Sequence, residues 1–86
     1  MKLRRSALDV FAIRRKTGRS QAEFARLIGV RVVTVASWEQ DRRRPSRIAR
    51  RMLELIWRSP DVIRRLDELL AAKREEMMLA VDRESD

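Results

Sequence analysis

Apolar residues recur at helical spacing along most of the chain, and β-branched residues nowhere alternate with polar ones over the length of a strand. The first such pattern runs from Ala7 to Lys16 and predicts a helix that stops at Thr17-Gly18. Its expected inward stripe consists of Leu8, Val10, Phe11 and Ile13.

The second predicted helix has signals at both ends. Ser20 and Glu23 have the spacing of a capping box, in which each side chain accepts a hydrogen bond from the other residue's backbone N–H. Gly29 suits the left-handed conformation that ends a helix. This helix of about ten residues has its apolar positions at Phe24, Ala25, Leu27 and Ile28.

A short third helix is expected from Val32 to Gln40, because Val35 and Trp38 lie three residues apart and can share a buried face. The basic segment 41–45 ends it.

Two more helices complete the prediction. Ser46 can cap a fourth helix that runs to about Arg58, and Ser59 can cap a fifth with Pro60 at its first position. The expected inward stripe of the fourth is Ile48, Met52, Leu55 and Ile56. The fifth has its apolar face at Val62, Ile63, Leu66, Leu69 and Leu70. This face continues more weakly at Met77, Met78 and Val81, and the last five residues are expected to be frayed. The predicted fold is an all-α five-helix bundle.

Composition narrows the function. A chain of 86 residues suits one small domain, and it contains no cysteine and no histidine. Disulfides, the common zinc clusters and imidazole acid/base chemistry are therefore excluded. The carboxylates are scattered over helix surfaces rather than grouped in an apolar pocket, so we expect no enzyme, no catalytic residue, no metal and no cofactor.

Charge is unevenly distributed. The net charge is +8, but residues 75–86 contribute −4, so residues 1–74 carry +12. A segment this basic attracts polyanions, with nucleic acid the first candidate and an anionic membrane the second. No apolar run approaches the roughly 18 residues of a spanning helix, and the N-terminus lacks the apolar stretch of a secretion signal. We therefore expect a cytoplasmic protein and no membrane partner.

Residues 20–45 resemble the helix-turn-helix of the Cro and lambda-repressor-like (XRE-type) family. The resemblance extends over roughly residues 13–57. It rests on the capped helix, the glycine turn, a Thr-Val-x-x-Trp-Glu helix and a basic loop that ends in proline. It implies a regulator that binds specific double-stranded DNA, with the helix that begins at Val32 in the major groove.

The resemblance also implies a set of DNA-contacting residues. Gln21 would meet a phosphate or assist a base contact, and the arginines of the loop would meet phosphates. The alternatives are that a valine packs in the core and that the arginines are only solvated. The residues expected to contact DNA are Gln21, Arg31, Val32, Val33, Thr34, Ser37, Arg42, Arg43 and Arg44.

Two neighbouring residues are expected to be structural. Trp38 matches a core position of the family, although an exposed tryptophan could instead stack on single-stranded nucleic acid. Glu39 resembles the family glutamate that pairs with an arginine of the first helix, which would be Arg14 here.

The stretch after the motif looks like the HigA-type antitoxin branch, whose members also neutralise a RelE-like toxin. The alternatives are a repressor without a toxin partner and a chain that mainly masks a toxin. We expect a DNA-binding domain at residues 1–70 and an acidic helical extension at 71–86. A homodimer on a palindromic operator is expected, with the fifth helix as interface, unless its first half packs on the first helix of its own chain.

Overall fold

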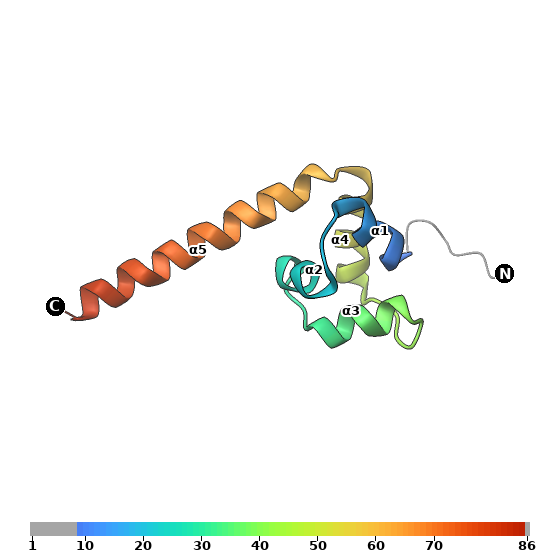
Figure 1. The fold of residues 1–86 in the computed structure, drawn as a ribbon, viewed down its shortest axis with the longest axis horizontal. Coiled ribbons are helices and arrows are strands. Elements are labelled where there is room, and N and C mark those ends of the chain that lie inside the picture. The colour runs from blue at the N-terminus through green and yellow to red at the C-terminus, as the bar shows by residue number, and fades with distance from the viewer. Residues whose placement is uncertain (1–8, 86) are drawn as a thin grey trace.

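The computed structural model describes the backbone of residues 9–85 and the side chains of residues 9–80. Within these residues the chain forms helices and no strand, which confirms the all-α prediction (Figure 1). No described helix is both long enough and apolar enough to cross a membrane. The five helices are α1 (Val10–Thr17), α2 (Gln21–Ile28), α3 (Val32–Glu39), α4 (Arg47–Arg58) and α5 (Asp61–Ser85).

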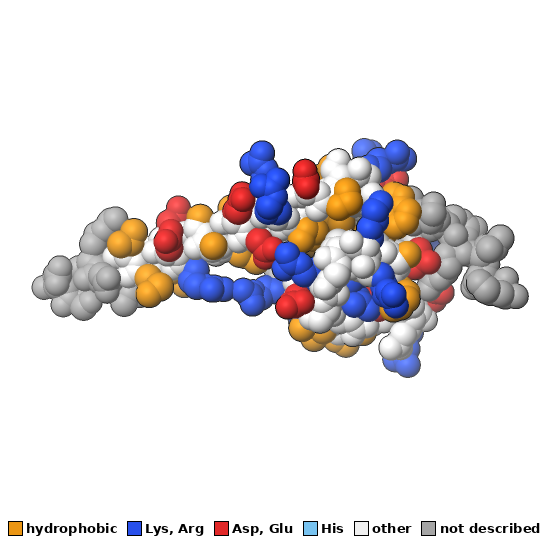
Figure 2. All heavy atoms as spheres, turned by 45° about the horizontal axis from the view of Figure 1, so that its top comes forward, with side chains coloured by type: hydrophobic (Ala, Val, Ile, Leu, Met, Phe, Trp, Pro, Cys, Tyr) orange, Lys and Arg blue, Asp and Glu red, His pale blue; other side chains and the backbone are white. Residues whose placement is uncertain are grey.

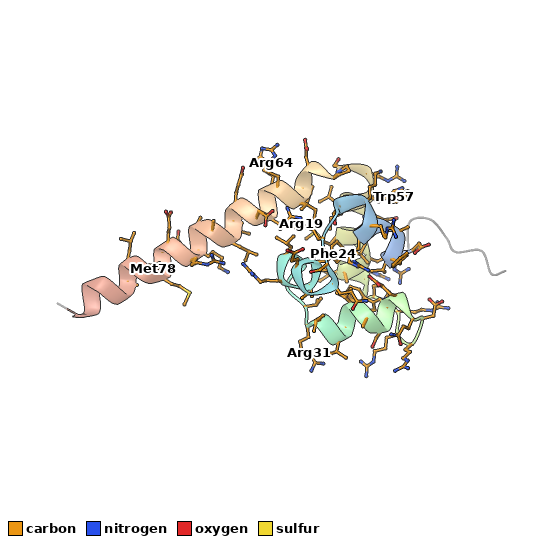
Figure 3. All side chains as sticks on the ribbon, in the orientation of Figure 1. Arg19, Phe24, Arg31, Trp57, Arg64 and Met78 are labelled. Atoms are coloured by element: carbon orange, nitrogen blue, oxygen red, sulfur yellow. The ribbon has the colours of Figure 1, made fainter. Side chains whose placement is uncertain are left out.

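All five helices contribute to one core. Phe24 of α2 lies at its centre, fully buried among side chains from the other helices (Figure 3). Burying a side chain of this size stabilises the fold by about 1.5–3 kcal/mol. The other buried residues are Val10, Ile13, Ala25, Leu27, Val35, Trp38, Leu53, Ile56 and Ile63.

The first helix begins later than the sequence predicts. The Asp9 side chain accepts a hydrogen bond from the backbone N–H of Ala12 at 3.1 Å, and this cap starts α1 at Val10. Residues 7 and 8 of the expected helix lie outside the described part of the chain. Phe11 is exposed, so its assignment to the inward stripe was wrong; the guanidinium carbon of Arg14 lies 5.5 Å from the centre of its ring.

Local signals fix α2 as predicted. Ser20 Oγ accepts from the Glu23 backbone N–H at 3.1 Å, and Glu23 Oε1 accepts from the Ser20 N–H at 2.9 Å. The hydrogen bond from the Ser20 backbone N–H, and to a lesser extent that with the Ser20 side chain, lowers the pKa of the exposed Glu23 carboxyl below its ordinary value. Gly29 ends the helix with φ 84°, in the left-handed region. Both ends of α2 are thus set by contacts between residues that are at most four positions apart in the sequence.

The inward face of α4 differs from the prediction. Ser46 caps the helix as expected, accepting from the Ala49 N–H at 3.2 Å. However, Ile48 is 81% exposed and Leu55 also faces solvent, whereas Leu53 is fully buried. Apolar residues lie on more than one side of this helix, and packing against α1 and α5 selected the side that carries Leu53.

Helix α5 is packed only in its first part. It begins at Asp61, directly after Pro60, and its inner residues lie mainly against α2 and α4. An ion pair of 2.5 Å between Arg19 Nη2 and Asp67 Oδ2 ties it to the start of α2. Leu69 of the expected apolar face is 54% exposed, and every residue from 71 to 80 is exposed. The helix leaves the bundle and continues to Ser85 (Figure 1).

Candidate nucleic-acid interface

The third helix lies at the edge of the bundle with one face buried and one face open (Figure 1). Val35 and Trp38 anchor it in the core, as predicted, and α2 is its main neighbour. The turn between them is held by the left-handed Gly29 and by a hydrogen bond of 3.0 Å from the Val30 N–H to the Ala25 carbonyl. A helix fixed in this way presents its outer face as a rigid unit.

The expected base-contacting residues occupy the open face of α3. Val32 and Val33 are 47% and 54% exposed, so neither packs in the core. Arg31 precedes the helix, and its side chain points away from the bundle without capping the helix (Figure 3). Thr34 and Ser37 are half-buried. The structure thus gathers these five residues on or beside one short helix.

Gln21 belongs to a polar network behind that face. Its side-chain amide donates to Glu39 Oε1 at 2.9 Å, and Arg14 donates to both oxygens of the same carboxylate, with Nε–Oε2 at 2.6 Å and Nη2–Oε1 at 3.2 Å. The predicted pair of Arg14 and Glu39 is therefore confirmed. The sequence did not show that this pair would also orient Gln21, because the three residues come from three helices.

The network is largely shielded from water, since the Arg14 and Glu39 side chains are only 14% and 7% exposed. Burial acts to raise the pKa of the Glu39 carboxyl, but the hydrogen bonds from Arg14 and Gln21 and the Arg14 charge outweigh it, and that pKa is lowered. The hydrogen bond to Glu39 in turn raises the pKa of Arg14. Both groups are charged at neutral pH and lock α1 to the end of α3.

The arginine loop folds back on α3. Asp41 adopts φ 61°, in the left-handed region that residues other than glycine seldom occupy. The backbone N–H groups of Arg42 and Arg43 then donate to the Ser37 carbonyl at 2.9 and 3.4 Å. The side chains of Arg42, Arg43 and Arg44 are exposed. Three cations are thereby held just beyond the C-terminal end of α3.

The exposed arginines near α3 include three residues of α4 that the sequence analysis did not predict to contact DNA. Arg47, Arg50 and Arg51 are exposed on α4 and line a shallow depression together with Glu54. Their spacing of three and four residues places them on one side of the helix, which was a signal available in the sequence. Arg19 contributes less to this charge, because Asp67 neutralises it.

Comparison with known proteins agrees with this geometry. Residues 10–48 match the model of a helix-turn-helix family; the match spans α1 to the first residues of α4 and excludes α5. No curated protein matches the chain. The matched segment contains the capped helix, the glycine turn and the half-exposed third helix described above. Residues 10–48 are therefore similar to the helix-turn-helix family in sequence as well as in geometry.

Proposed function

We propose that this protein is a transcriptional repressor that binds a specific double-stranded DNA sequence. The observation that carries the proposal is the exposure of Val32 and Val33 on a helix whose opposite face is locked in the core. Apolar side chains on a rigid, solvent-facing helix suit contact with thymine methyl groups in the major groove. The +12 charge of residues 1–74 supplies the long-range attraction to DNA.

The site residues divide into two roles under this proposal. Those on or next to the open face of α3 contact base edges: Arg31, Val32, Val33, Thr34 and Ser37. Arg31 can donate two hydrogen bonds to a guanine, whereas the hydroxyl groups discriminate less between bases. The others contact phosphates and set the register of the helix in the groove: Gln21, Arg42, Arg43 and Arg44. The network with Glu39 orients Gln21 for this role.

The repressor acts as a homodimer on a palindromic operator. One helix of this length contacts few base pairs, and proteins of this kind reach useful affinity by pairing on half-sites about 34–36 Å apart. In this arrangement residues 1–70 form the DNA-binding domain and residues 71–86 form an acidic extension that serves protein association.

Selection of bound sequences from a random duplex library tests the proposal. The expected result is a palindromic consensus, and binding to it should exceed binding to unrelated duplexes by at least about a thousandfold at the same salt. An Arg31→Ala variant serves as the control, because it should lose preference at one position of each half-site while still binding DNA. Failure to enrich any duplex sequence would refute specific recognition, whatever the affinity for bulk DNA.

A second candidate is that the chain is also the antitoxin of a toxin–antitoxin pair. The exposed Met77 and Met78 on the free part of α5 favour it, because flexible thioether side chains adapt to irregular protein surfaces (Figure 3). The net charge of −4 over residues 75–86 suits a basic partner. Co-purification with the product of a neighbouring gene, lost when both methionines are replaced by lysine, would support this role. If the chain purifies without that product, the remaining interpretation is a repressor without a toxin partner.

A further inference from the structure

Helix α5 carries a regular seam along one side, which runs from its packed first part into its free second part. From Ala71 to Ala80 every residue is exposed, and a helix segment without tertiary contacts gains little stability from its own propensity (Figure 1). Spacings of four and three residues alternate along the seam, which is the repeat that pairs two helices in a coiled coil. Its members are Val62, Leu66, Leu69, Lys73, Glu76 and Ala80.

The seam changes character along its length. Val62 and Leu66 are partly buried against the core of their own domain. Leu69 is 54% exposed, and the later members and Met77 are exposed as well. Figure 2 shows hydrophobic and charged side chains interspersed along this projecting helix. The apolar line is interrupted by two charges one turn apart, Lys73 and Glu76. Neither forms an ion pair with another side chain among residues 9–80.

We propose that this seam binds the α5 of a second copy of the chain in antiparallel orientation. The two charges specify both the partner and the register. If Lys73 lies level with Glu76 of the partner subunit, the two-fold symmetry places Glu76 level with the partner's Lys73, and two ion pairs form across the seam. In the same register Leu69 lies opposite Ala80 of the partner subunit, so that apolar layers flank the charged ones on both sides.

Other occupants fit the seam less well. A parallel second copy would set Lys73 against the partner's Lys73 and Glu76 against the partner's Glu76, and both contacts are repulsive. A partner of one charge sign would satisfy one of these two residues and repel the other. Only a partner with the inverse order of charges neutralises both, and the same helix running in the opposite direction has that order.

The register also sets the distance between the two domains. Ile63 is the residue of α5 that is buried in the core of its own domain. At 1.5 Å per residue, Ile63 and the partner's Ile63 are about 35 Å apart along the helix pair. This distance matches one turn of DNA, the separation of half-sites that the proposed function requires. The dimer itself forms without DNA, so it can be tested separately from that function.

Charge variants of the seam provide the test, with the full chain at several concentrations in sedimentation equilibrium and no DNA present. The wild-type chain should show a mass twice the 10.2 kDa of one copy. Lys73→Glu alone and Glu76→Lys alone each replace two attractive pairs by two repulsive ones, and should weaken dimerisation by about tenfold or more. The double variant K73E/E76K restores both pairs and should recover the wild-type dissociation constant. Circular dichroism should show equal helix content for the wild-type chain and K73E/E76K, and lower helix content for each single variant where it is monomeric, because the free part of α5 gains little stability alone.

Mixing the wild-type chain with the double variant determines the orientation. Antiparallel pairing predicts that each protein pairs with itself, because the mixed pair opposes like charges; parallel pairing predicts the reverse. A monomeric wild-type chain, single variants with unchanged dissociation constants, or preferential mixed dimers would each overturn the inference. A monomer that still selects a specific duplex would refute only the dimer, whereas a dimer that selects none would refute only the proposed DNA recognition.

Discussion

Replacing Glu39 with glutamine should both destabilise the fold and weaken DNA binding. The substitution keeps the shape of the side chain but removes its negative charge and one of the two oxygens that accept hydrogen bonds from Arg14 and Gln21. Arg14 is then left mostly buried without a countercharge. For a fully buried ion pair such a loss costs about 3–5 kcal/mol, and the remaining exposure of 14% for Arg14 lowers our expectation to about 2 kcal/mol.

Thermal unfolding measures this loss directly. For a domain of this size, 1 kcal/mol changes Tm by about 4–8 °C, so Glu39→Gln should melt roughly 8–16 °C below the wild-type protein at pH 7. Replacing both partners, as in the double variant R14M/E39M, should cost less than the sum of the two single losses, because no buried charge is left unpaired. DNA affinity of Glu39→Gln should fall beyond the effect on folding, because the glutamine amide keeps only one acceptor oxygen, for which Gln21 then competes with Arg14.

The pH dependence of Tm can refute the role of the Glu39 carboxylate in stabilising the fold. The pKa of Glu39 is lower in the folded protein than in the unfolded chain, where it is about 4.3. The stabilisation is therefore complete above pH 4.3 and is lost as the pH falls through the lower folded value. The difference in Tm between wild type and Glu39→Gln should shrink over that window. A difference that stays constant down to pH 3, or a Tm unchanged at pH 7, would show that the network does not stabilise the fold.

Three further predictions concern the DNA interface and the N-terminal cap of α2. Arg43→Ala should weaken binding to all sequences alike and reduce the slope of log affinity against log salt by about 0.9; a changed base preference with an unchanged slope would contradict the phosphate assignment. Val33→Gln should alter the preferred base pair at one position per half-site by about 1–3 kcal/mol with little change in Tm, because Val33 is already exposed. Ser20→Ala should lower stability by about 1 kcal/mol through loss of the cap, and an unchanged unfolding curve in urea would argue against it.

Much of the candidate site was predictable because it depends on short-range contacts. The capping box of α2 joins residues three apart, and the left-handed Gly29 needs no long-range partner. Val35 and Trp38 were expected to be buried, because their spacing places them on one side of a short helix. The pairing of Arg14 with Glu39 spans 25 residues and followed from the resemblance to the helix-turn-helix family, not from local pattern.

Tertiary structure decided which of several apolar faces became the inner one. In α4 the apolar residues lie on more than one side, so the hydrophobic pattern permitted Ile48 and Leu55 as well as Leu53, and contact with α1 and α5 selected Leu53. Phe11 and Leu69 were likewise apolar at helical spacing and are exposed. Local sequence signals set both ends of α2 and the start of α4, because caps and turns are contacts within a few residues. Contacts with neighbouring helices decided which face each helix buries and how much of α5 is covered. These neighbours come together only in the folded chain.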